Sequence, residues 1–230
     1  MRLVIVDLDG TLLAAASEIR FIAHLAATRR IGLGGLLRSL AFALRYGPRF
    51  GRHVWKKNKA YLAGLSSAKV ERWGRAFATE RLSPLLRGAM RERIARHRAA
   101  GDHVLLMTGT PDFLAKPLAE AVDADSWIAT ACAQENGRYL ASPPLCHPFA
   151  GEKLQRAREA AERLGLSLAD CVAYADTGND IELLAAVGTA IAVAPDRVLA
   201  RRARGDGWEI MAEENARPLH RILSWTGQRA

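Results

Sequence analysis

Leu3-Val4-Ile5-Val6-Asp7-Leu8-Asp9-Gly10-Thr11-Leu12-Leu13 is the stretch of sequence that decides the fold of this chain. It begins with four apolar, mostly β-branched residues, which are typical of a buried parallel strand. Asp7 and Asp9 follow this strand, and ligands bind at that edge of an open α/β sheet. Gly10 allows a sharp turn, so both carboxylates can project into one crevice. Because two such anions repel each other, the stretch predicts a divalent cation between them and protonation of one carboxyl group. The alternative is an acidic turn without a metal.

The composition indicates a soluble globular protein. Half of the 230 residues are hydrophobic and a quarter are charged, so the chain can bury one good core and add a modest second unit. Cys132, Cys146 and Cys171 are too few and too scattered for a disulfide framework or a zinc site, which indicates a reducing compartment. We see neither the apolar run of a signal peptide nor a charge-free run long enough to cross a bilayer. We therefore expect a cytoplasmic protein.

The positive charge is concentrated in one segment. The net charge of the chain is +9, but residues 14–82 hold fourteen Lys or Arg against three acidic residues, and no acidic residue lies between Glu18 and Glu71. Such a field attracts anionic partners, which include phosphorylated substrates, nucleic acid and anionic membrane surfaces.

The same segment has a helical pattern. Leucines at 33, 36, 37, 40 and 44 share one side of a helix, with Arg38 and Arg45 off that stripe. We expect Gly47-Pro48 to break this helix, and further helices from Arg49 to Lys59 and from Ser67 to Thr79. The pattern predicts an all-helical cap domain, residues 14–82, inserted into an α/β core domain formed by residues 1–13 and 83–230.

An α/β rhythm follows the insertion. We expect a helix that ends at Gly101, a hairpin at Asn136-Gly137 and a helix from Gly151 through Leu164. The predicted strands of the parallel, Rossmann-like sheet are His103–Met107, Trp127–Ala131, Cys171–Ala175, Thr189–Val193 and Trp208–Met211.

Polar clusters follow these strands and open one of the helices. Thr108-Gly109 ends a strand just before a helix start, which favours an anion site, although a simple helix cap has the same composition. The positive charge of Lys153 lies near a helix N-terminus, where it destabilises the helix. The position therefore favours a nearby anion, although a solvated lysine is the alternative. Asp176 and Asp180 flank a glycine and can place one carboxylate on a metal and the other in its outer shell. Together the clusters suit phosphoryl transfer.

These motifs resemble, in order and context, the four motifs of the haloacid dehalogenase-like superfamily. The insertion is similar to the cap of the subfamily that includes phosphoserine phosphatase. The resemblance implies a Mg²⁺-dependent phosphomonoesterase in which Asp7 is phosphorylated and Asp9 is the general acid and base. It implies that Thr108, the Gly109 amide and Lys153 hold the phosphoryl oxygens.

The resemblance also implies a metal site. Asp7 and Asp176 would share Mg²⁺ with the Leu8 backbone carbonyl, for which the Asp9 carbonyl is the alternative. Asp180 would orient metal-bound water from the outer shell.

The substrate is left open by departures from the family pattern. Thr108-Gly109-Thr110 replaces the Ser-Gly-Gly typical of phosphoserine phosphatases, and the insertion is loosely similar to that of phosphatidylglycerophosphatase C-type enzymes. A soluble phosphorylated metabolite and a lipid head-group phosphate therefore compete as substrates. The candidate substrate contacts in the insertion are Glu18, Arg20, Arg52 and Lys56.

The sequence also bears on a membrane-binding role and on three alternative functions. The leucine stripe could lie on anionic lipid at the inner face of the membrane, or it could pack on the other helices of the insertion. A phosphoaccepting signalling module also uses acidic residues and Mg²⁺, but it would place its acceptor on an internal strand. A nucleic-acid binder is disfavoured because Tyr46, Trp55 and Tyr61 offer few stacking groups. A dehalogenase would need neither Asp9 nor Mg²⁺.

Overall fold

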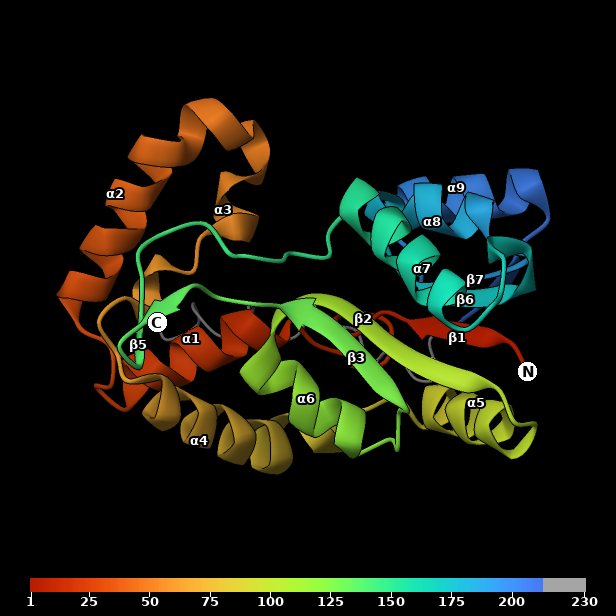
Figure 1. The fold of residues 1–230 in the computed structure, drawn as a ribbon, viewed down its shortest axis with the longest axis horizontal. Coiled ribbons are helices and arrows are strands. Elements are labelled where there is room, and N and C mark those ends of the chain that lie inside the picture. Colours follow the sequence, from red (N-terminus) through yellow and green to blue (C-terminus); the bar gives the residue numbers. More distant parts are fainter. Residues whose placement is uncertain (213–230) are drawn as a thin grey trace, which may run out of the picture.

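Six parallel strands form the sheet at the centre of the computed structural model, which describes residues 1–212 (Figure 1). Their order is β3-β2-β1-β6-β7-β8, so β1 lies between β2 and β6. This order confirms the predicted α/β class with a parallel, Rossmann-like sheet. The strands are β1 (Leu3–Val6), β2 (His103–Pro111), β3 (Ser126–Thr130), β6 (Cys171–Ala175), β7 (Thr189–Val193) and β8 (Glu209–Met211).

Helices cover both faces of this sheet (Figure 1). Leu3 and Ile5 of β1 pack in one hydrophobic cluster with residues of α7 (Gly151–Arg163), α8 (Ile181–Ala186) and α9 (Arg197–Asp206). Val4 and Val6 point to the other face, toward α5 (Gly88–Ala99) and α6 (Asp112–Glu120). Burial on both faces explains why β1 is apolar throughout instead of alternating.

Residues 14–82 contain helices and turns and extend beyond one end of the sheet (Figure 1). The helices are α1 (Ser17–Ala27), α2 (Leu33–Phe50), α3 (Val54–Lys57) and α4 (Ser67–Phe77), followed by a π-helical turn at Ala78–Leu82. The predicted hairpin, β4 (Gln134–Glu135) and β5 (Arg138–Tyr139), joins this region, since Gly64 N–H donates to the Tyr139 carbonyl at 2.8 Å. The domain boundaries at residues 14 and 82 remain a prediction.

The predicted helix break at Gly47-Pro48 is wrong, because α2 continues through both residues to Phe50. Pro48 removes one backbone donor and its ring crowds the Leu44 carbonyl, but only two residues of the helix follow it, so little helix remains to be disrupted. The helix ends at Gly51, which has a φ of +52° and donates its N–H to the Gly47 carbonyl. The helix predicted from Arg49 to Lys59 is correspondingly reduced to a 3₁₀ turn and the short α3.

The leucine stripe of α2 does not pack on the other helices of the insertion within the described residues, and its side chains are exposed. The opposite side of α2 makes the packing contacts instead, through the buried Phe42 and Gly35. No helix among residues 1–212 has the length and apolar character needed to span a membrane. All three cysteines are free.

Gly188, in the turn before β7, gives a test of this packing. A Cβ atom at this position would lie 1.9 Å from the Ala169 carbonyl oxygen. We expect Gly188→Ala to lower the free energy of unfolding by about 1–3 kcal/mol, because the backbone on both sides must shift. Urea denaturation measures this change.

Gly205→Ala is the matched control, because Gly205 lies in α9 with no atom within 4 Å of its added Cβ. That variant should keep or slightly raise the free energy of unfolding, since alanine favours a helix over glycine. Equal stability of the two variants would contradict the packing at Gly188.

Candidate functional site

The predicted polar clusters meet in one pocket at the carboxyl edge of the sheet. The pocket has a volume of about 140 Å³. It is closed on one side by Glu18, Lys56 and Lys59 of the insertion. The core residues that line it are Asp7, Asp9, Thr108, Gly109, Thr110, His147, Pro148, Phe149, Lys153, Asp176, Thr177, Asn179 and Asp180.

Three carboxylates and one lysine form the centre of the pocket. Asp7, Asp176 and Asp180 each place a carboxylate oxygen within 4.8 Å of the others. Lys153 Nζ lies 2.7 Å from Asp7 Oδ1 and 2.9 Å from Asp180 Oδ1. Lys153 is buried, so the solvated alternative for this lysine is excluded, and the anions expected near the start of α7 are these two carboxylates.

The electrostatics of this cluster favour a divalent cation. Burial raises the pKa of Asp7, and the neighbouring Asp180 and Asp176 add to the effect, whereas Lys153 opposes it. Burial and the charge of Asp180 likewise raise the pKa of Asp176. The whole pocket holds five carboxyl groups and three lysines, so when all are ionised the excess negative charge equals the charge of one divalent cation. Clustered carboxylate oxygens are the donors that Mg²⁺ prefers, so the residues present fit the metal.

Gly10 brings two of these carboxylate-bearing segments together. It has a φ of +86°, and a Cβ atom there would lie 1.9 Å from Asp176 Oδ2. Thr11 Oγ1 donates a hydrogen bond to Asp176 Oδ1 at 3.2 Å. The turn after β1 therefore requires glycine both for its backbone conformation and for the close approach of Asp176.

The backbone carbonyls of this turn are not equivalent. The Leu8 oxygen accepts hydrogen bonds from Thr11 N–H at 3.3 Å and from Leu13 N–H at 2.8 Å. Among the described residues, no hydrogen bond is made to the Asp9 carbonyl. The turn therefore uses the Leu8 carbonyl internally, and the geometry favours the Asp9 carbonyl, which the sequence offered as the alternative metal ligand.

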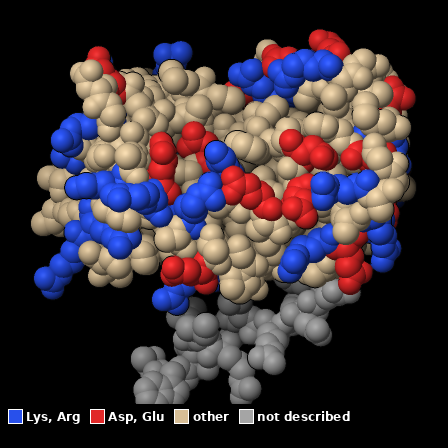
Figure 2. Space-filling view, turned by 60° about the horizontal axis from the view of Figure 1, so that its bottom comes forward, with Lys and Arg blue, Asp and Glu red and all other residues tan. Residues whose placement is uncertain are grey.

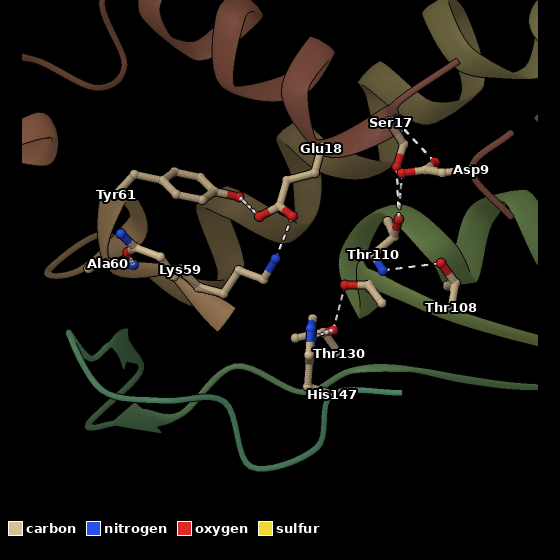
Figure 3. Close-up of polar contacts among 12 residues, drawn as sticks. Asp9, Ser17, Glu18, Lys59, Ala60, Tyr61, Thr108, Thr110, Thr130 and His147 are labelled. Atoms are coloured by element: carbon tan, nitrogen blue, oxygen red, sulfur yellow. Dashed lines mark hydrogen bonds and ion pairs between the residues drawn. The ribbon is translucent and has the colours of Figure 1, made fainter. Parts of the chain in front are cut away.

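Asp9 lies in different surroundings from Asp7 (Figure 3). Its carboxylate accepts hydrogen bonds from Ser17 N–H at 3.1 Å and from Thr110 Oγ1 at 3.2 Å. The Ser17 hydroxyl oxygen lies 2.9 Å from the Thr110 hydroxyl oxygen. Burial raises the pKa of Asp9, although these hydrogen bonds oppose the shift. Sequence reasoning assigned no role to Ser17 or Thr110, because their contact with Asp9 joins the start of α1 to the end of β2.

Thr108 and Gly109 belong to an extended segment, because β2 continues to Pro111. Thr110 N–H donates to Thr108 Oγ1 at 3.1 Å, which leaves the Thr108 hydroxyl hydrogen for a ligand. Thr130 Oγ1 donates to the Gly109 carbonyl at 2.6 Å and lies 2.8 Å from His147 Nδ1 (Figure 3).

His147 is a pocket residue that the sequence analysis missed. The Thr130 hydroxyl uses its only hydrogen on Gly109, so His147 Nδ1 must carry a hydrogen and donate it to Thr130. Burial lowers the pKa of His147 to about 3, with Lys59 and the other nearby lysines acting in the same direction. His147 is therefore a neutral group. It comes from the loop after the hairpin, where no sequence pattern marked it, whereas Thr130 lies near the end of the predicted strand Trp127–Ala131.

The insertion contributes a paired charge to the pocket. Lys59, which is buried, forms an ion pair with Glu18, and Tyr61 Oη donates to Glu18 Oε1 at 2.9 Å (Figure 3). Glu18 and Lys56 line the pocket as expected from the sequence.

Arg20 and Arg52, the other two candidate substrate contacts, do not line the pocket. Two residues correspond to about 200° around a helix, so Arg20 lies on the other side of α1 from Glu18. Arg52 is exposed, and its Nε donates to His53.

Comparisons with known proteins show which family this chain matches. The family model described as haloacid dehalogenase-like hydrolase matches residues 4–185. A Mycobacterium tuberculosis protein named phosphoserine phosphatase SerB1 is 32% identical over 225 residues, which cover 94% of this chain and 72% of that protein.

Solved structures share the fold. A crystal structure of a protein of unknown function from Bordetella pertussis Tohama I matches with a TM-score of 0.78 at 29% identity, over 91% of this chain and 97% of that chain. A phosphoserine phosphatase with a phospho-aspartyl intermediate analogue matches with a TM-score of 0.64 at 20% identity, over 93% and 94% of the two chains.

The raised pKa values predict how pH and Mg²⁺ affect stability. Between the ordinary carboxyl pKa of 3.8 and the raised values of Asp7 and Asp176, the folded protein binds more protons than the unfolded chain. The metal-free protein should therefore lose stability as the pH rises from about 4 to about 8. Mg²⁺ at a hundred times its dissociation constant should restore about 2.7 kcal/mol. At one fixed Mg²⁺ concentration the stabilisation should be largest at high pH, where the carboxylates are ionised and bind the ion most tightly.

Thermal unfolding with and without Mg²⁺ measures both effects. Asp176→Asn should raise the stability of the metal-free protein at high pH and weaken the response to Mg²⁺. Asp206→Asn, at the exposed end of α9, is the matched control and should keep the full response. A metal response that is absent at every pH would rule out the cation site.

Proposed function

This chain belongs to the haloacid dehalogenase-like hydrolase family and has the fold of its phosphatases, and we propose that it hydrolyses a phosphomonoester through phosphorylated Asp7. The observation that carries the proposal is the buried contact of Lys153 with Asp7 beside two further carboxylates. Lys153 occupies Asp7 Oδ1, and no described residue donates a hydrogen bond to Asp7 Oδ2, which leaves that oxygen available as a nucleophile.

In the first step, an Asp7 oxygen attacks phosphorus, so a bond from Asp7 to phosphorus forms as the bond to the leaving oxygen breaks. Asp9 gives its proton to that leaving oxygen. In the second step, Asp9 takes a proton from water as the water oxygen attacks phosphorus, and this attack releases Asp7 and inorganic phosphate. The raised pKa of Asp9 suits a group that must be protonated in the first step.

Groups from the end of β2 and from the first turn of α7 would hold the phosphoryl group. The Thr108 hydroxyl and the Gly109 N–H can donate hydrogen bonds to its oxygens, and Lys153 offsets their charge. Ser17 and Thr110 keep the Asp9 carboxyl in place. Mg²⁺ would be held by Asp7, Asp176 and the Asp9 carbonyl, with Asp180 beside them, and would supply further positive charge to the phosphoryl oxygens.

The paired state of Glu18 bears on the leaving group. A relative is named phosphoserine phosphatase, and a phosphoserine leaving group carries an ammonium that a free carboxylate would bind. Here Lys59 and Tyr61 already bind Glu18, and Lys56 adds positive charge to the same wall. We infer that the substrate lacks an ammonium group, as in a glyceryl phosphate that is either free or part of a lipid head group. Phosphoserine is the second candidate, on the strength of that relative.

A phosphoaccepting signalling module is disfavoured. Its acceptor would follow an internal strand of the sequence, whereas Asp7 follows the first strand, and nothing in such a module needs the helical insertion.

Asp7→Asn tests the chemistry. An amide cannot act as the nucleophile, so we expect phosphate release with Mg²⁺ to fall at least about a thousandfold. The assay covers glycerol phosphate, phosphoserine, histidinol phosphate and sugar phosphates, together with a glycerophosphate lipid. Asp206→Asn should retain full activity, and urea denaturation should show that Asp7→Asn still folds. Turnover by folded Asp7→Asn would exclude Asp7 as the nucleophile.

Lys59→Met tests the leaving-group preference. Without Lys59, Glu18 keeps one neutral partner and presents an unpaired negative charge to the pocket. We expect the ratio of kcat/KM for phosphoserine to that for glycerol phosphate to rise roughly tenfold.

Lys69→Met, at an exposed position of α4, is the matched control and should leave this ratio unchanged. If the wild type already prefers phosphoserine and Lys59→Met lowers both values equally, the assignment of the leaving group is incorrect.

A further inference from the structure

The outer side of α2 is a continuous apolar surface, which we call the leucine stripe. Its members recur at intervals of three and four residues, so they lie along one side of a helix about 27 Å long. They are Leu33, Leu36, Leu37, Leu40 and Leu44, with exposed fractions of 79%, 62%, 66%, 52% and 73%.

The fold of the described residues does not use this stripe. α2 is anchored by its other side, where Phe42 is 2% exposed and packs with Tyr46 at a ring separation of 4.6 Å. Gly35 is also buried, and a Cβ atom there would lie 3.4 Å from the Tyr61 carbonyl. An exposed apolar surface that does not serve the fold marks an interaction site.

The charges around the leucine stripe indicate what covers it. Residues 19–70 contain eleven Lys or Arg and no acidic residue, and the preceding Glu18 is neutralised by Lys59. Arg45 and Arg49 of α2 are exposed, and by helical spacing both lie on one flank of the helix, roughly 120° and 160° around from Leu33. Figure 2 shows Lys and Arg gathered at the end of the molecule where Figure 1 places α2. The partner must therefore combine an apolar interior with negative charge.

A second copy of this chain meets only half of that requirement. A symmetric pair would bring two leucine stripes together, but it would also bring together two strongly basic surfaces, which repel each other. An anionic bilayer offers acyl chains to the leucines and phosphate groups to the arginines, whose long side chains can reach the head groups.

We propose that α2 docks on an anionic membrane surface, with the leucine stripe among the acyl chains and the basic residues of the insertion at the head groups. Lys56 and Lys59 follow α2 in the chain and line the pocket, so docking would hold the pocket close to the lipid surface. This proposal concerns a surface outside the pocket and does not depend on the proposed chemistry.

Vesicle flotation of the full chain tests the proposal. One set of vesicles is phosphatidylcholine, of which roughly one lipid in three is replaced by phosphatidylglycerol, and the other is phosphatidylcholine alone. The protein should float with the anionic vesicles at about 0.05 M salt and much less at about 0.5 M salt, because salt screens the basic surface. It should float weakly with phosphatidylcholine alone.

Two variants identify the surface. Leu37→Gln/Leu40→Gln should weaken binding to the anionic vesicles at least roughly tenfold, because the free energy of transferring two leucine side chains from water into the acyl chains is lost. Arg45→Glu/Arg49→Glu should weaken it similarly through charge. Leu145→Gln/Val198→Gln is the matched control, since these side chains are 77% and 62% exposed outside the insertion, and it should bind as the wild type does. Urea denaturation verifies that each variant folds.

Several outcomes would overturn the proposal. These are no flotation of the wild type at low salt, equal flotation with both kinds of vesicle, and equal loss in the control variant. A further outcome comes from light scattering without lipid. If the wild type is a dimer that Leu37→Gln/Leu40→Gln dissociates, and if it does not float with vesicles, the leucine stripe binds a second copy of the chain. Phosphate release is measured separately, so its presence or absence leaves these results unaffected.

Discussion

The structure depends on the burial of Lys153 between Asp7 and Asp180. This contact ties the first turn of α7 to residues that follow β1 and β6, and so it gathers three distant segments at one edge of the sheet. Removing one partner of such a buried pair typically costs about 3–5 kcal/mol, because the other charge is left uncompensated. One lysine does not balance the three carboxylates around it, and this imbalance makes the pocket receptive to a divalent cation.

Two aspartates one residue apart acquire different chemistry from their surroundings. Asp7 faces a lysine and two carboxylates, whereas Asp9 is held by the N–H of Ser17 and the hydroxyl of Thr110. A nucleophile needs a free, ionised oxygen, and a general acid needs a pKa close to the working pH. The turn that follows β1, and not strand alternation, carries the two side chains to these separate environments, so a short motif supports both roles in the proposed reaction.

The helical insertion has two surfaces with opposite properties. Toward the pocket its one carboxylate, Glu18, is paired, because Lys59 and Tyr61 bind it. Toward solvent it presents unpaired cations and the leucine stripe. In the proposed reaction the pairing limits what the pocket can recognise in a leaving group, whereas the outer surface has no part in the proposed chemistry. The proposed substrate preference and the proposed membrane docking therefore depend on different sides of the same few helices.

The sequence by itself determined the parallel sheet, the order of its motifs and the meeting of Asp7, Thr108, Lys153 and Asp176, because strand patterns are local and parallel strands end at a common edge. Only the tertiary structure decided that α2 passes through Gly47-Pro48, that the Leu8 carbonyl is used within its turn, and that the leucine stripe is exposed. It also revealed His147 and the pairing of Glu18. These features depend on contacts between segments remote in the chain, or on the exact end of a turn, and no local pattern of residues encodes them.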